Sequence, residues 1–371
     1  MEYQVYNGTG SNYSSDNGSP GPYPGMPPRP PMPVDVLLDF KKYAYVITCA
    51  VGILGNILIY IVFTRTKLKK PSTSRYLAAA AVADSGYLLA VMFVKLGEFH
   101  KFRFHQLIGP CQIITFGEHA FSFLSRWYLT AVIVEKYIGV MWPRKKSEMC
   151  TVFRAKCVII CIAILGIVCY LYVTLFVGVS GNPPQCKLYG DDFSALETWA
   201  VLSKFDTIFN FVLPYLIMLI LTMPIGFLTW QYHKRSVTTS ETFLRRRRGQ
   251  SNEGKEFKTT PLLILLSCCT LILCTPSSAL RLKDFTNPFM GKRPNETDIL
   301  LMGLFHYFAV LNSAIKIFVY IVASISFARE LGTVFCAVRK LWKRSDSNEL
   351  QTRHVLKEAD EHFVISTEGT V

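Results

Sequence analysis

The stretch CQIITFGEHAFSFLSRWYLTAVIVEKY, residues 111–137, decides the fold, because it is one of seven long and largely apolar stretches in the chain. A helix needs about 20 apolar residues to cross the bilayer core. Three of the stretches carry no charged residue: Tyr43–Phe63, Cys157–Val179 and Pro261–Leu280. The other four are as long and carry a few ionisable residues: Tyr76–Leu96, Ile108–Val134, Phe205–Trp230 and Ile299–Ser326. The sequence therefore predicts an all-α membrane protein, a bundle of seven transmembrane helices followed by a short amphipathic cytoplasmic helix.

The basic residues are concentrated between the apolar stretches. The chain has 371 residues, half of them hydrophobic, and a net charge of +14, which fits one membrane domain with tails. Three loops carry clusters of positive charge, and the positive-inside rule places them in the cytoplasm. Their basic residues are Arg65, Lys67, Lys69 and Lys70; Arg144, Lys145, Lys146, Arg154 and Lys156; and Lys234, Arg235 and 245–248. This distribution predicts contact with anionic membrane lipid and gives no support for nucleic-acid binding.

Glycosylation motifs give an independent indication of orientation. All four sequons fall in segments that the charge rule places outside, at Asn7, Asn12, Asn17 and Asn295. Seven spans then place the amino end outside and the carboxyl end in the cytoplasm of a multi-pass plasma-membrane protein. No apolar run precedes Tyr43, so we expect the first span to act as the targeting signal. We divide the chain into an extended glycosylated tail (1–40), the bundle (41–326), and an amphipathic helix with a cytoplasmic tail (327–371).

Few of the 11 cysteines can form a disulfide. Seven lie inside the predicted spans, where the simplest role is apolar packing. Cys150 and Cys336 face the cytoplasm, where thiols stay reduced. Only Cys111 and Cys186 face an oxidising space, so the sequence predicts a bridge between them.

These features, taken in order, resemble the rhodopsin-like (class A) G-protein-coupled receptors over roughly residues 41–336. The first span contains Gly55-Asn56, and the second contains Asp84. Cys111 stands 25 residues before Lys136, which is the family spacing. Further matching positions are Pro143, Cys186, Pro214, Pro276, Tyr320 and 327–329. The stretches 74–77 and 149–151 look most like those of peptide receptors.

The resemblance implies a receptor for a neuropeptide or other short peptide, which signals through a heterotrimeric G protein, arrestin or both. Receptor kinases are further implied partners. Similar receptors use the positions that correspond to Glu135, Lys136, Tyr137, Tyr320, Pro276 and Pro214 for signalling. They are often palmitoylated at the position of Cys336. The resemblance implies no cofactor, metal or catalytic residue.

The chain departs from the family where activation takes place. The acidic-Arg-Tyr motif reads Glu135-Lys136-Tyr137, and lysine lacks the planar guanidinium fork of arginine. Lys316-Ile317 replaces an Asn-Pro pair, and Cys274 replaces a tryptophan. The resemblance therefore carries over the fold better than the activation machinery, and a receptor with little G-protein coupling is an alternative.

Charged residues inside the spans are candidates for a ligand site, because a charge at mid-bilayer costs about 2.5–3.5 kcal/mol. Glu118 stands where amine receptors carry their ammonium-binding aspartate. It could bind a cationic ligand group or pair internally with Lys95 or His306. Asp206 and Arg281 could likewise pair with each other or face a ligand. We expect Glu118, Asp206, Arg281, His306 and Lys95 to surround an outer cavity.

Asp84 and Lys316 should form a buried ion pair. Each lies ten residues from the cytoplasmic end of its span, or roughly 15 Å deep at helical rise. Similar receptors hold a sodium ion at this aspartate, and a lysine ammonium would take its place. In the alternative, Lys316 extends toward the cytoplasm or pairs with Glu135.

Two other functional classes are less well supported. A transporter would show internal repeats and helices broken near the midplane, and no repeat is visible. A membrane enzyme would need converging His and Asp residues at ligand spacing. His100, His105, His119 and His306 have no acidic partner at such a spacing.

Overall fold

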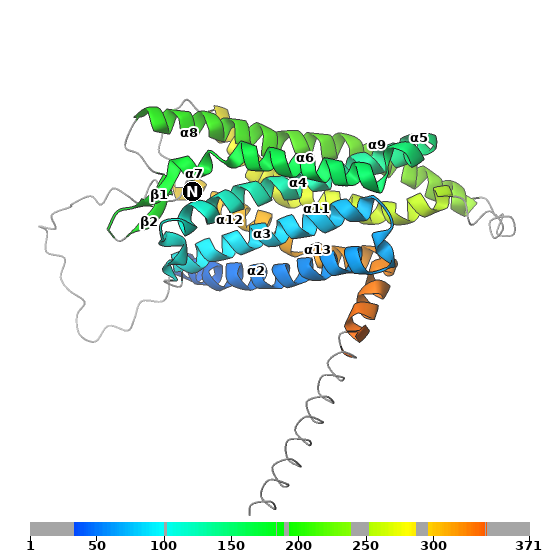
Figure 1. The fold of residues 1–371 in the computed structure, drawn as a ribbon, viewed down its shortest axis with the longest axis horizontal. Helices are drawn as coiled ribbons and strands as arrows, with labels where there is room; N and C mark the ends of the chain where they lie inside the picture. Colours follow the sequence, from blue (N-terminus) through cyan, green and yellow to red (C-terminus); the bar gives the residue numbers. More distant parts are fainter. Residues whose placement is uncertain are drawn as a thin grey trace, which may run out of the picture.

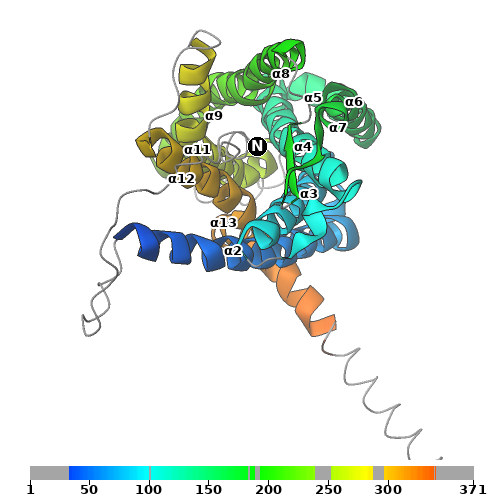
Figure 2. The same cartoon turned by 90° about the vertical axis from the view of Figure 1, so that its left-hand side faces the viewer.

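The structure is a computed structural model that describes residues 33–99, 102–182, 184–188, 193–238, 252–286, 296–337 and 339. The described chain is almost entirely helical, and its long helices run side by side (Figure 1). Seen from one end, they form a ring (Figure 2). The first helices are α2 (Pro33–Arg65), α3 (Thr73–Phe99), α4 (Pro110–Met141) and α6 (Val152–Tyr170). They are followed by α8 (Phe193–Asp206), η3 (Thr207–Val212), α9 (Leu213–Thr238), α11 (Asn252–Thr286), α12 (Glu296–Ala314) and α13 (Lys316–Ala323).

The helices have the length and composition of membrane spans. Within the described residues, five helical segments are long and apolar enough to cross a membrane, and the bent pair of α12 and α13 adds a sixth. Helix α4 is 32 residues long but carries Glu118, Ser122, Ser125 and Arg126 in its middle. It contacts α3, α6, α9 and α11, so protein rather than lipid surrounds it. Together these segments make the bundle of seven crossing helices that the sequence predicts.

The outward faces of the helices are apolar. Helix α6 exposes Ile160, Ile164, Leu165 and Val168. A water-soluble protein rarely exposes so many aliphatic side chains together. Lipid tails are the solvent that suits this surface.

Two spans are interrupted by irregular helical geometry. The fifth span contains a π-helical segment, η3, which ends two residues before Pro214, whose ring nitrogen has no hydrogen to donate. The last span bends by 47° between α12 and α13, at Ile315. Phe318 N donates to Ile315 O over 3.0 Å, a tight i+3 bond that restarts the helix after the bend. The bend therefore forms even though Ile317 replaces the family proline.

Short elements close the two ends of the bundle. One end holds η1 (Lys67–Lys69), α5 (Pro143–Met149) and a helix at 325–337. The other end holds η2 (Arg103–Gln106), α7 (Val173–Phe176) and the strands β1 (Val177–Ser180) and β2 (Gln185–Leu188). The strands pair antiparallel, with Val179 opposite Cys186.

The structure moves three boundaries that the sequence analysis predicted. Helix α2 begins at Pro33, so residues 33–40 continue the first span and do not belong to an extended tail. The fourth span does not reach Val179, because α6 ends at Tyr170 and the chain passes through α7 into β1. A continuous apolar run does not distinguish a strand from a helix, so only pairing with β2 reveals this end. The amphipathic helix begins at residue 325, two residues earlier than predicted.

Candidate functional site

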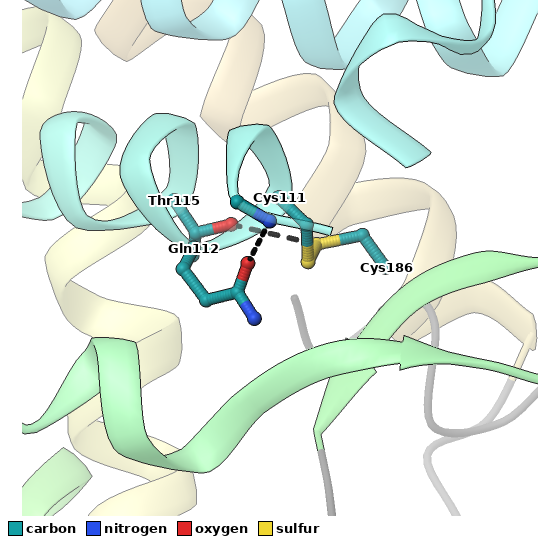
Figure 3. The surroundings of a disulfide bond; sticks show 5 residues. Cys111, Gln112, Thr115 and Cys186 are labelled. Atoms are coloured by element: carbon teal, nitrogen blue, oxygen red, sulfur yellow. Dashed lines mark hydrogen bonds between the residues drawn. A yellow bond between two sulfur atoms is a disulfide. The ribbon is translucent and has the colours of Figure 1, made fainter. Parts of the chain in front are cut away.

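A disulfide fixes the hairpin over one end of the bundle. Cys111 at the start of α4 is bonded to Cys186 in β2, with a Cα–Cα distance of 5.6 Å (Figure 3). Gly109 has φ 93°, a conformation that favours glycine, and its N–H donates to Gln112 Oε1 over 2.8 Å. This turn directs α4 so that Cys111 faces the strand. The predicted bridge is confirmed.

The first charged pair of the site lies on α4 and α12. His306 Nε2 is 3.5 Å from Glu118 Oε1, and both side chains are partly exposed. On the other side of the ring, Tyr45 OH lies 3.2 Å from His306 Nδ1 and donates to Gly303 O over 3.1 Å. Both ring nitrogens of His306 therefore face oxygen atoms. Of the two internal partners considered for Glu118, the structure selects His306.

Lys95 has a different environment. Its ammonium lies 2.6 Å from Glu98 Oε2 on the same helix, and 5.1 Å from the centre of the Tyr45 ring. It therefore borders the Glu118 and His306 pair through Tyr45. It is not within ion-pair distance of Glu118.

The second charged pair centres on Asp206, at the end of α8. Arg281 Nη1 lies 3.7 Å from Asp206 Oδ2. Tyr170 OH donates to Asp206 Oδ1, and Asn210 Nδ2 donates to the same oxygen over 3.2 Å. Asp206 thus joins α6, η3 and α11 at one carboxylate.

Arg126 extends this network toward the middle of the bundle. Its Nη1 donates to Asn210 Oδ1 over 2.7 Å, and its Nε donates to Tyr215 OH over 3.1 Å. The guanidinium groups of Arg126 and Arg281 each lie 4.2 Å from the centre of the Phe211 ring. Such stacking stabilises a guanidinium that is partly removed from water. A continuous path of polar and stacking contacts therefore joins Arg281 to the middle of α4.

The sequence analysis missed four members of this network: Tyr170, Asn210, Phe211 and Tyr215. Asn210 follows Asp206 by four residues, so helical periodicity could have placed both on one face. Tyr170 lies in the fourth span, and no pattern in the sequence indicates that it bonds to Asp206. The predicted cavity between the two charged pairs stays a prediction.

A third group of polar residues lies deep in the bundle. Lys316 Nζ is 2.6 Å from Asp84 Oδ2, and the two side chains are 6% and 0% exposed. Ser125 Oγ donates to Asp84 Oδ1 over 2.6 Å and accepts from Lys316 Nζ over 3.2 Å. The adjoining cavity has a volume of about 10 Å³, roughly the space that one water molecule needs. This is the geometry that the depth of the two residues in their spans predicts.

The end of α4 farther from the disulfide carries Glu135, Lys136 and Tyr137. Glu135 accepts hydrogen bonds from Ser72 Oγ, over 3.0 Å, and from Thr73 Oγ1. Glu135 is thus held by two hydroxyl groups, and the alternative in which Lys316 pairs with it is wrong. Lys136 is buried.

The remaining predicted signalling residues lie on neighbouring helices. Tyr320 in α13 packs against Phe63 and Phe327, with ring centroids 5.4 Å and 5.1 Å away. Pro276 lies inside α11, and Pro214 lies one residue into α9. Their positions match a seven-helix receptor, and their roles in signalling stay predictions.

The remaining predicted sites are the palmitoylation and glycosylation positions. Cys336 is exposed on the helix at 325–337. Asn7, Asn12, Asn17 and Asn295 lie outside the described residues.

The fold, the disulfide-fixed hairpin and the charged residues inside the helices define a class of protein, the seven-helix membrane receptors. Residues 55–320 match the model of the family "7 transmembrane receptor (rhodopsin family)", and the chain belongs to this family. It is a multi-pass membrane protein.

Curated relatives show where in the family the similarity lies. The thyrotropin-releasing hormone receptor of Gallus gallus is 33% identical over 129 residues, which is 34% of this chain and 32% of the relative. Neuropeptides B/W receptor type 2 of Homo sapiens is 27% identical over 271 residues, 71% of this chain and 75% of the relative. Somatostatin receptor type 2 of Mus musculus is 25% identical over 171 residues, 45% of this chain and 45% of the relative. The matched region spans about a third of the length of the thyrotropin-releasing hormone receptors.

Proposed function

We propose that this chain is a plasma-membrane receptor for a neuropeptide or other short peptide, with its amino end outside and its carboxyl end in the cytoplasm. Three of its relatives are named for thyrotropin-releasing hormone, neuropeptides B/W and somatostatin, which supports a peptide ligand. The basic loops support the orientation. A heterotrimeric G protein is the proposed signalling partner, and arrestin and receptor kinases are proposed regulators.

The observation that carries the peptide proposal is the presence of two ion pairs in the half of the bundle nearer the disulfide. Glu118 with His306, and Asp206 with Arg281, each combine one acidic and one basic group. His306 and Arg281 are partly exposed, whereas Asp206 is almost fully buried. A peptide with an ammonium and a carboxylate could replace one partner in each pair without leaving a buried charge uncompensated.

If the charged groups of the peptide replace one partner in each ion pair, the peptide will bind one conformation of the bundle more tightly than another. A ligand shifts a conformational equilibrium only if it binds one state more tightly. After loss of Arg281, Asp206 would still be bonded to Asn210, and Asn210 to Arg126, so a shift of Asp206 would reach Arg126 through Asn210. The same contacts that bind the peptide would then reposition the middle of α4.

A receptor that binds its ligand with little nucleotide exchange on G proteins is the second candidate. Lys136 favours it, because an ammonium makes one point contact where a guanidinium makes two parallel hydrogen bonds. The buried pair of Asp84 and Lys316 favours it too, because a direct ion pair holds α3 and α13 together. Arrestin recruitment without second-messenger change would identify this case.

The test is a screen of neuropeptide pools on cells that express the full chain, with second messengers and arrestin recruitment read in parallel. Once an agonist is found, Glu118→Gln should weaken its binding at least tenfold with surface expression retained. Glu148→Gln is the matched control, because it removes an exposed carboxylate of α5, at the other end of the bundle from the disulfide. Equal agonist affinity in both variants and the unmodified chain would assign Glu118 a structural role only.

A further inference from the structure

A basic groove lies between the turn after α2 and the helix at 325–337. It has a volume of about 590 Å³, within the range of small-molecule sites. Figure 1 shows that this helix, in orange, leaves the bundle at the end where α2 turns into α3. The lining residues are Ile61, Arg65, Thr66, Lys67, Lys69 and Lys70 from the turn, and Glu330, Thr333, Val334 and Ala337 from the helix.

The turn that carries the lysines is held in place at both ends. Thr66 Oγ1 donates to Val62 O over 2.7 Å and accepts from Leu68 N, which caps η1. Ser74 Oγ, at the start of α3, donates to Leu68 O over 2.6 Å. The three lysines of the groove are therefore presented by an anchored turn.

The opposite wall is fixed by aromatic packing. Phe327 is almost fully buried, and its ring lies 5.1 Å from that of Tyr320 and 5.5 Å from that of Phe63. Leu331, one helical turn later, is also buried. These contacts hold the first turns of the helix against α2 and α13, so the groove has two positioned walls.

Within the part of the chain that the structure describes, the charges of the groove are not balanced. Arg65, Lys67, Lys69 and Lys70 are exposed, and none of them lies within ion-pair distance of a carboxylate in the described part of the chain. Among the described residues, Glu330 is the one acidic residue that lines the groove, so this lining has a formal balance of +3. Several cations that face one space, without acidic partners, favour a ligand with several negative charges.

We propose that this groove binds the headgroup of a polyphosphorylated inositol lipid. Arg65 ends the first membrane span, so the groove lies at the level of the lipid headgroups. Arginine binds phosphate through two hydrogen bonds, and the lysines add point charges. Phosphatidylserine is a poorer fit, because its headgroup carries an ammonium and one net negative charge.

The apolar part of the groove points to a lipid rather than a soluble phosphate. Ile61, Val334 and Ala337 line it beside the basic residues. The same helix exposes Ile325 and Phe335, as expected of a helix that lies in the membrane interface. A lipid can place its phosphates on the lysines and its chains along this apolar wall.

The test uses the full chain in nanodiscs of phosphatidylcholine that contain either phosphatidylinositol 4,5-bisphosphate or phosphatidylserine at equal total negative charge. Native mass spectrometry counts the bound lipids, and binding of a fluorescent phosphatidylinositol 4,5-bisphosphate gives the apparent Kd. We expect preferential retention of the inositol lipid. The combined Lys67→Gln, Lys69→Gln and Lys70→Gln variant should raise its Kd between about tenfold and 100-fold.

Two controls separate this site from general charge attraction. Arg144→Gln, Lys145→Gln and Arg154→Gln remove the same charge from exposed positions near α5 and should change Kd less than threefold. Glu330→Gln removes the opposing carboxylate and should lower Kd. Equal effects of the two triple variants would overturn the proposal, as would equal retention of phosphatidylserine. Competition by soluble inositol 1,4,5-trisphosphate at the affinity of the lipid would overturn the lipid assignment. None of these readouts needs a peptide agonist, so they do not depend on the proposed receptor function.

Discussion

The buried pair of Asp84 and Lys316 gives the most demanding prediction. Asp84→Asn removes the carboxylate and leaves the buried ammonium of Lys316 without its counter-charge, with Ser125 Oγ 3.2 Å away. Lys316→Met leaves a carboxylate with one hydrogen bond, from the same hydroxyl. Removing one partner of a buried pair typically costs about 3–5 kcal/mol, because the other charge stays uncompensated. For a domain of this size, that loss corresponds to a fall in melting temperature of roughly 5–10 °C.

The double change D84N/K316M removes both charges, and should recover much of the loss. Thermal unfolding of the four proteins in detergent or nanodiscs gives the coupling free energy, which we expect to be about 3 kcal/mol or more. The pair of Lys95 and Glu98 provides a matched control, since it is partly exposed and its cycle should give at most about 1 kcal/mol. If the free-energy loss of the double variant equals the sum of the two single losses to within about 0.5 kcal/mol, the buried pair is refuted.

Sodium provides a second test of the same reasoning. In the unmodified chain the ammonium of Lys316 occupies the position beside Asp84, so replacing potassium with sodium should leave the melting temperature unchanged. Lys316→Met frees the carboxylate beside Ser125, and this variant should be stabilised by sodium. A sodium effect on the unmodified chain, on stability or on agonist affinity, would contradict the assignment.

Three further predictions concern other parts of the bundle. Lys136→Arg should raise nucleotide exchange on G proteins if the missing guanidinium limits coupling; no change at equal surface expression would assign the limit to other positions. Gly52→Ala should destabilise the chain by about 1–3 kcal/mol in thermal unfolding, because a Cβ there would lie 2.7 Å from Ala314 Cβ. Gly226→Ala is the control: its Cβ would meet no atom within 4 Å, so this change should be neutral or stabilising in the same assay. Cys186→Ser should lower surface expression and agonist affinity, and an unchanged peptide affinity would show that the hairpin does not shape the ligand site.

The sequence predicts the bundle well because membrane insertion is a local property. Each span is recognised from about 20 neighbouring residues, without knowledge of its partners. The disulfide was predictable because topology left two cysteines on the outer side. The pair of Asp84 and Lys316 was predictable because both positions lie at the same depth, and a charge at that depth must find a partner.

The network around Asp206 could not be derived in this way. Tyr170, Asn210 and Arg281 reach this carboxylate from α6, η3 and α11, and their depths alone do not say which helices are neighbours or how each is rotated. The π-helical segment further changes which residues of the fifth span face the interior.

The sequence by itself determined that this chain crosses the membrane seven times, which loops carry the basic charge, and which polar residues are placed at an energetic cost inside the spans. Those properties follow from the free energy of moving each side chain from water into lipid, which depends on the local chain. The tertiary structure decided that Glu118 pairs with His306 rather than Lys95, that Arg126 connects to Asp206 through Asn210, and that the lysines of η1 face a groove beside a helix more than 250 residues away. These contacts depend on the rotation and packing of helices that are distant in sequence, because in a uniformly apolar solvent the interactions between helices, rather than hydropathy, select the partners.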